Sequence, residues 1–77
     1  MSAASDKILI VDDESFIRMA LREALRSWNY NSLEAGTVKD ALRVFAEEDP
    51  GVILLDIDLP DGSGLDVLKE IKQRSSE

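Results

Sequence analysis

Lys7-Ile8-Leu9-Ile10-Val11-Asp12-Asp13 is the stretch that decides the fold of this chain of 77 residues. Residues 8–11 are all aliphatic, and the run stops abruptly at two acids. A strand that is apolar on both faces is typical of a parallel sheet covered by helices on each side. We therefore predict a buried strand over residues 7–11 in an α/β domain.

Helices and strands alternate along the rest of the chain. Apolar residues recur at spacings of three and four from about residue 15 to residue 28, which indicates an amphipathic helix. Residues 32–35 are typical of a short, weaker strand that ends at a glycine. Thr37 and Asp40 resemble an N-cap pair, which predicts a second helix running to about residue 48.

A second fully apolar strand is predicted over Val52-Ile53-Leu54-Leu55, and it also ends on an acid, Asp56. A loop rich in Asp, Pro and Gly follows over residues 58–62. Ser63 then favours the N-cap position of a third helix. The apolar face expected for that helix consists of Leu65, Leu68 and Ile71.

The predicted order is therefore βαβαβα, which defines a doubly wound parallel sheet. Right-handed crossovers place the second and third strands on opposite sides of the first, so we predict the strand order 2-1-3. In open α/β sheets, ligands bind outside the carboxyl ends of the strands where the strand order reverses. Here that point lies between the first and third strands.

Carboxylates follow both strands at this point. Asp12 and Asp13 leave the first strand and Asp56 leaves the third, and adjacent strands are only about 4.8 Å apart. The chain has no cysteine or histidine, so a metal here is a hard cation such as Mg²⁺, Mn²⁺ or Ca²⁺ held by oxygen. Two carboxylates, a main-chain carbonyl and waters suit Mg²⁺, and Asp56 has the chemistry of a carboxylate nucleophile. The alternative is that these aspartates only begin turns or cap helices, as Asp13 would for the first helix.

The net charge, the apolar stretches and the N-terminal residues limit the classes of protein to which this chain can belong. Sixteen acids against nine bases give a net charge of −7, so we expect no direct nucleic-acid binding by this segment. No apolar stretch approaches the length of a membrane span, and residues 1–6 lack the features of a signal peptide. We expect a cytoplasmic protein with a flexible tail over residues 1–6.

These residues resemble a known family. Ile10-Val11-Asp12-Asp13-Glu14, followed by Leu54-Leu55-Asp56-Ile57-Asp58-Leu59-Pro60 and Gly64, is similar to the receiver domain of two-component response regulators. The resemblance implies a flavodoxin-like fold and a phosphorelay signalling module, not an enzyme. It also implies that Asp56 is the phospho-acceptor and that a sensor histidine kinase is the donor. In the family pattern, Asp13 and Asp56 bind Mg²⁺ directly, Asp12 binds it through water, and Asp58 contributes its main-chain carbonyl.

The sequence departs from the family pattern in its extent. A complete receiver has five βα units, and residues 7–77 match three of them. The Ser or Thr and the Lys that contact the phosphoryl group in the family follow the fourth and fifth strands, and Lys69 and Lys72 lie on the wrong element to replace them. We therefore expect impaired phosphorylation. The third strand becomes a sheet edge, which predicts a homodimer through that strand.

Two alternatives stay open at this point. One is an excised or designed half-domain that self-assembles through its third strand and keeps the acidic site only as a vestige. The other is a fragment of a haloacid-dehalogenase-type phosphatase, because Asp56-Ile57-Asp58 after an apolar strand also resembles the DxD motif of those enzymes. The second alternative leaves Asp12 and Asp13 unexplained.

Overall fold

The structure, a computed structural model, describes residues 7–75 and shows three parallel strands that alternate with three helices. Its elements are β1 (Lys7–Val11), α1 (Ser15–Ser27), β2 (Asn31–Ala35), α2 (Val38–Glu48), β3 (Val52–Leu55), β4 (Asp58–Leu59), β5 (Gly62–Ser63) and α3 (Gly64–Ser75). The predicted βαβαβα order is confirmed. The loop predicted before the third helix contains a short antiparallel hairpin, β4–β5. The tail expected over residues 1–6 lies outside the described residues.

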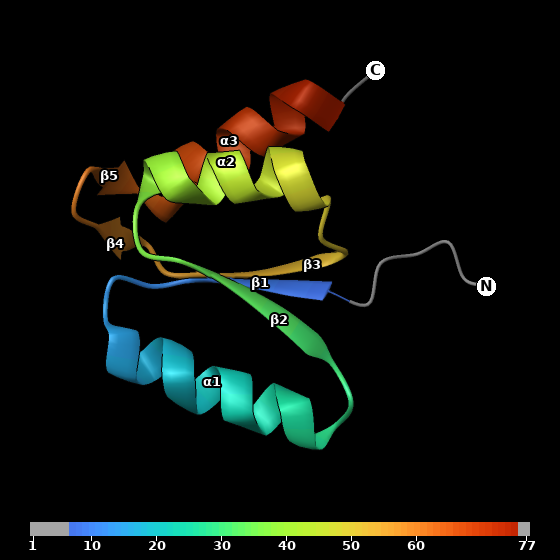
Figure 1. Ribbon diagram of the computed structural model, residues 1–77. Coiled ribbons are helices and arrows are strands. Elements are labelled where there is room, and N and C mark those ends of the chain that lie inside the picture. The colour runs from blue at the N-terminus through green and yellow to red at the C-terminus, as the bar shows by residue number, and fades with distance from the viewer. Residues whose placement is uncertain (1–6, 76–77) are drawn as a thin grey trace.

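The main sheet has the predicted strand order, β2-β1-β3, and all its strands are parallel. Leu9 in the central strand is in register with Leu33 on one side and Ile53 on the other. Figure 1 shows α1 on one face of the sheet and α2 with α3 on the opposite face. This three-layer arrangement explains why β1 is apolar on both faces from Ile8 to Val11.

The core consists of two clusters, one on each face of the sheet. Side chains alternate along β1, so Leu9 and Val11 pack with α2 and α3 whereas Ile8 and Ile10 pack with Leu25 of α1. Leu9 and Ile10 are completely buried. Burying side chains of this size contributes about 1.5–3 kcal/mol each. Among the described residues, the α2 and α3 face carries the larger cluster.

Local signals define the ends of α1 and α2. Asn29 has a φ of 68°, and its N–H and that of Tyr30 donate to the carbonyls of Arg26 and Leu25, which is the hydrogen-bond pattern of a Schellman motif. At the start of α2, the Thr37 hydroxyl accepts from the Asp40 N–H at 3.0 Å, as predicted.

The helices described within residues 7–75 include none with the length and apolar character of a membrane span.

The apolar face of α3 differs from the prediction. Val67 is completely buried, whereas Leu65 and Leu68 are 60% and 53% exposed. Ile71 packs against the core as expected. Positions 64, 67, 68 and 71 all fit a helical repeat, so spacing alone does not decide which side of α3 faces α2. The capping prediction is confirmed, because the Ser63 hydroxyl accepts from the Leu65 N–H at 3.0 Å.

Candidate metal centre

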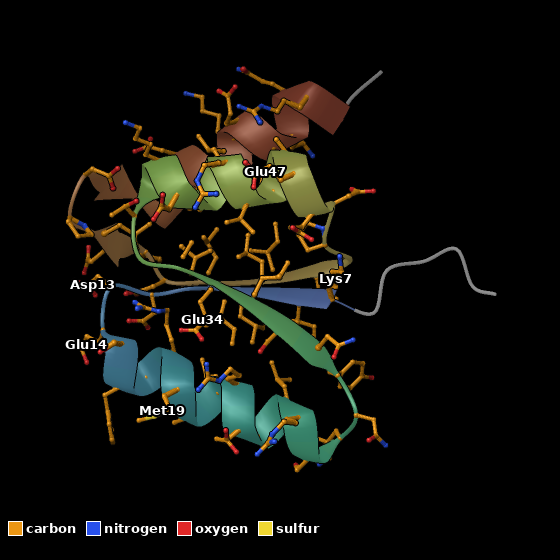
Figure 2. All side chains as sticks on the ribbon, viewed as in Figure 1. Lys7, Asp13, Glu14, Met19, Glu34 and Glu47 are labelled. Carbon is orange, nitrogen blue, oxygen red and sulfur yellow. The ribbon has the colours of Figure 1, made fainter. Side chains whose placement is uncertain are left out.

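The three predicted acids stand where β1 and β3 end, and the sheet itself positions their backbones. The Asp12 N–H donates to the Ala35 carbonyl at 3.0 Å, and the Asp56 N–H donates to the Val11 carbonyl at 2.9 Å. Both residues therefore extend the ladder of parallel hydrogen bonds by one step. Asp13 follows in the turn that leads into α1 (Figure 2).

The carboxylates converge as the strand order predicts. One oxygen from each of Asp12, Asp13 and Asp56 lies within 4.8 Å of the other two. Asp13 is exposed, while Asp12 and Asp56 are half-buried. Three like charges at this separation repel one another, and a bound cation would offset that repulsion.

The oxygens of this cluster are not equivalent. Asp12 Oδ1 accepts a hydrogen bond from the Glu14 N–H at 2.9 Å, which leaves its second oxygen available. Among residues 7–75, no hydrogen bond to a carboxylate oxygen of Asp13 or Asp56 is present. Carboxylate oxygens that accept no hydrogen bond from the protein are available to a cation, so this cluster fits a hard divalent cation held by oxygen.

Arg18, which the sequence did not single out, braces the β1–α1 turn. Its Nη1 donates to the main-chain carbonyl of Asp12 at 2.7 Å, and its Nε donates to Glu34 Oε1 at 3.0 Å. Arg22 bonds the other oxygen of the same glutamate at 3.0 Å. Figure 2 labels Glu34, which lies between the sheet and α1. An arginine three residues into a helix gave no sequence signal of this role, because its partners lie on two other segments.

Gly64 allows α3 to begin directly against the third strand. A Cβ at this buried position would clash with the Asp56 carbonyl oxygen and lie 3.0 Å from Leu55 Cγ. The Gly64 N–H donates to the Ile57 carbonyl at 2.7 Å. The glycine therefore fixes the distance between the Asp56 backbone and the start of α3.

Asp58 occupies a different position from the three clustered acids. It begins β4 and pairs with Ser63, and its side chain is exposed. Within the described part of the chain, the acidic cluster comprises Asp12, Asp13 and Asp56 and leaves the Asp58 side chain outside. The predicted contribution of the Asp58 main-chain carbonyl stays a prediction.

Comparison with known proteins identifies the family. The sequence model of one protein family, the response regulator receiver domain, matches residues 8–77 of this chain. The transcriptional regulatory protein KdpE of Mycobacterium tuberculosis is 48% identical over 61 residues, which are 79% of this chain and 27% of KdpE. The sporulation initiation phosphotransferase F of Bacillus subtilis is 37% identical over 68 residues, which are 88% of this chain and 55% of that protein.

Solved structures give the same result. The response regulator TrrA of Thermotoga maritima, in complex with Mg²⁺ and BeF, superposes with a TM-score of 0.86 at 37% identity, over 91% of this chain and 61% of that one. The receiver domain of a LuxO repressor protein from Vibrio parahaemolyticus superposes with a TM-score of 0.86 at 30% identity, over 91% and 54%. The chain thus spans little more than half of these receivers.

The family match also decides between the two resemblances of the Asp56-Ile57-Asp58 segment. The matched region contains both strands with their acids, whereas the phosphatase alternative leaves Asp12 and Asp13 unexplained. The strand order and the acids at the carboxyl ends of β1 and β3 agree with this assignment. The chain belongs to the response regulator receiver domain family.

Proposed function

We propose that this chain is a phosphorelay receiver module in which Asp56 accepts a phosphoryl group from a histidine kinase. The observation that carries the proposal is the convergence of three carboxylates from two adjacent strands within 4.8 Å, in a member of the receiver family. In this proposal Mg²⁺ (or Mn²⁺) is held directly by Asp13 and Asp56. Asp12 contributes through a water molecule, and Asp58 contributes its main-chain carbonyl.

Asp56 is suited to the role of nucleophile. Its backbone is fixed by the hydrogen bond to Val11, and no protein donor among residues 7–75 occupies its carboxylate. A carboxylate oxygen attacks phosphorus, a P–O bond forms, and the P–N bond to the donor imidazole breaks with its electron pair going to nitrogen. The bound cation would supply the positive charge that offsets the negative charge of the phosphoryl oxygens.

A protein donor must bring its phosphohistidine to the acidic end of the sheet, so it contacts the surface around that end. Phe16 and Met19, in the first turns of α1, are 70% and 47% exposed. Figure 2 shows Met19 on the helix that begins beside Asp13 and Glu14. TrrA, a structural neighbour at 37% identity, was solved in complex with the histidine kinase ThkA. We propose that the kinase partner of this chain contacts the same exposed apolar side chains.

Intact-mass measurement tests the phospho-acceptor. The chain is incubated with Mg²⁺ and a small phosphodonor, and Asp56→Asn and an EDTA-treated sample are run in parallel. A fraction of the parent chain is expected to gain the mass of one phosphoryl group, because we expect phosphorylation to be impaired, and neither control is expected to gain it. An unmodified parent chain, or equal modification of Asp56→Asn, would overturn the proposal.

A second proposal concerns assembly, because β3 is, with β2, one of the two edge strands of the sheet described for residues 7–75. Val52 is 51% exposed and Leu54 is 37% exposed, and α1 packs mainly over β1 and β2. Ile57, Leu65 and Leu68 add exposed apolar surface after the same strand. We propose that two copies pair their third strands as a homodimer, which would satisfy the free backbone groups of the edge.

A further inference from the structure

We infer that Asp61 is a positioning residue for the cation site: its carboxylate fixes the β4–β5 hairpin on the start of α2 and so holds the Asp58 backbone beside the acidic cluster. This inference rests on the proposed function, in which the Asp58 carbonyl binds Mg²⁺. Asp61 lies in the turn between β4 and β5, outside the cluster itself.

The contact between the hairpin and α2 is a two-pronged helix cap. Asp61 Oδ1 accepts from the Val38 N–H at 2.7 Å, and Oδ2 accepts from the Lys39 N–H at 3.1 Å. The first four N–H groups of an α-helix have no partner within the helix. Here Asp61 satisfies two of them, across 23 and 22 residues of sequence.

Thr37 satisfies a third N–H group of the same helix end, because its hydroxyl accepts from the Asp40 N–H at 3.0 Å. Its carbonyl accepts the first hydrogen bond within the helix, from the Ala41 N–H at 2.9 Å. The end of α2 is therefore capped by one residue next to it and one from the hairpin. The two caps can be distinguished by mutation. Removing the Thr37 hydroxyl is expected to weaken α2 alone, whereas removing the Asp61 carboxylate is expected to release the hairpin from α2 as well.

The hairpin needs anchors of this kind because each of its strands has only two residues. An isolated hairpin is marginally stable in water even when it is longer. Its base is held by the Gly64 N–H bond to Ile57, and its Leu59 side chain is buried in the core. Asp61 holds the turn of the hairpin. At the neighbouring Gly62, an added Cβ would lie 3.2 Å from Val38 Cγ2, which shows that the turn lies close to the start of α2.

Displacement of the turn is transmitted to the site because the connection is short. Asp58 starts β4 two residues after Asp56 and pairs with Ser63 across the hairpin. The hydrogen bond from Val38, followed by that from Lys39, keeps the pKa of Asp61 below its ordinary value, so the cap is ionised at neutral pH. A charged carboxylate at a helix N-terminus is also favoured by the helix dipole.

The experiment compares three variants of the full chain by calorimetric Mg²⁺ titration: Asp61→Ala, Asp61→Asn, which keeps one acceptor oxygen, and Thr37→Ala as the matched cap control. Circular dichroism establishes that each variant is folded under the titration conditions. Asp61→Ala is expected to raise the Kd for Mg²⁺ about threefold to tenfold, below the usual loss for a residue that contacts a metal ligand directly. Asp61→Asn should lie between Asp61→Ala and the parent. Thr37→Ala should stay within about twofold of the parent, since its cap is local to the helix.

Amide exchange in the metal-free protein supplies an independent readout. If Asp61 holds the hairpin, the Gly64 amide exchanges faster in Asp61→Ala than in Thr37→Ala. Unchanged Mg²⁺ affinity in Asp61→Ala, or an equal loss in Thr37→Ala, would overturn this inference and leave the proposed function intact. Absence of Mg²⁺ binding by the parent chain would instead overturn the proposed cation site, and with it the role of Asp61 at that site.

Discussion

At the scale of single residues, Gly64 is where the packing beside Asp56 is tightest. A methyl group there would clash with the Asp56 carbonyl, so Gly64→Ala must push α3 away from β3. We expect a loss of about 3 kcal/mol in the free energy of unfolding, which urea denaturation measures. Gly51→Ala is the control, because Gly51 is exposed and its φ is not positive. Equal stability of Gly64→Ala and Gly51→Ala would contradict the role of Gly64.

Asp61 gives a prediction for the pH dependence of stability. The Val38 and Lys39 amides lower its pKa in the folded state, so it stabilises the fold at pH values above its unfolded pKa. That contribution is lost as the pH falls through the lowered folded value. The difference in urea midpoint between the parent and Asp61→Asn should therefore be present at neutral pH and shrink in acid below the unfolded pKa. A difference that is constant from neutral to acid pH would contradict the prediction.

The sequence predicted the residues of the cluster but not those that brace it. Asp12, Asp13 and Asp56 could be placed together because strand ends and the reversal of strand order determine which segments meet. Asp61 was visible only as part of a turn, and its partners on α2 lie 22 and 23 residues away. A capping contact between distant segments depends on tertiary packing, which spacing in the sequence does not encode.

At the scale of elements, Arg18 connects α1 to β2 and to the end of β1. Its side chain is 20% exposed and contacts both Glu34 and the Asp12 carbonyl. We expect Arg18→Ala to lower the free energy of unfolding by about 2 kcal/mol, since hydrogen bonds that involve charged groups are lost.

Arg22→Ala is the matched control, because Arg22 bonds the same glutamate but is 47% exposed and, among the described residues, makes no hydrogen bond to the turn at Asp12. Its loss should be below about 1 kcal/mol, as for most exposed ion pairs. Urea denaturation of the two variants side by side measures the difference. Equal losses would show that Arg18 does not brace the turn.

The elements themselves were predicted well, and the orientation of α3 was not. β3 and residues 8–11 of β1 are continuous aliphatic runs, and α1 and α2 carry clear helical spacing and end signals, so their order and type follow from local chemistry. Val67 and Leu68 are adjacent apolar residues, and only the packing of α3 against α2 decides that Val67 is buried. The β4–β5 hairpin has two residues per strand and resembled an ordinary turn in the sequence.

At the scale of the whole molecule, the edge strand β3 predicts self-association. Sedimentation of the parent chain should show a dimer, and Leu54→Lys should shift it to the monomer, because a charge on an edge strand opposes pairing. Phe16→Lys is the control, since it replaces an apolar side chain that is more exposed but lies on α1. A parent chain that stays monomeric at all concentrations, or a dimer that Leu54→Lys leaves intact, would contradict pairing through β3.

The arrangement of the whole molecule was predictable because right-handed crossovers leave few choices for three parallel strands. The strand order β2-β1-β3 follows from that rule together with the sequence order. The same rule brings Asp12 and Asp13 beside Asp56, so the architecture and the candidate site were predicted by one argument. The predicted contribution of the Asp58 carbonyl rests on the family resemblance alone.

The central claim, that acids from β1 and β3 form one Mg²⁺ site, is tested most directly by titrating Mg²⁺ into the parent chain, Asp13→Asn and Asp58→Asn. The parent should bind one ion per chain. Asp13→Asn should weaken binding at least about tenfold, because it removes a charged ligand. Asp58→Asn should bind like the parent within about twofold, because its side chain lies outside the cluster and only its carbonyl is used. Parent-like binding by Asp13→Asn, or no binding by the parent chain, would contradict the account.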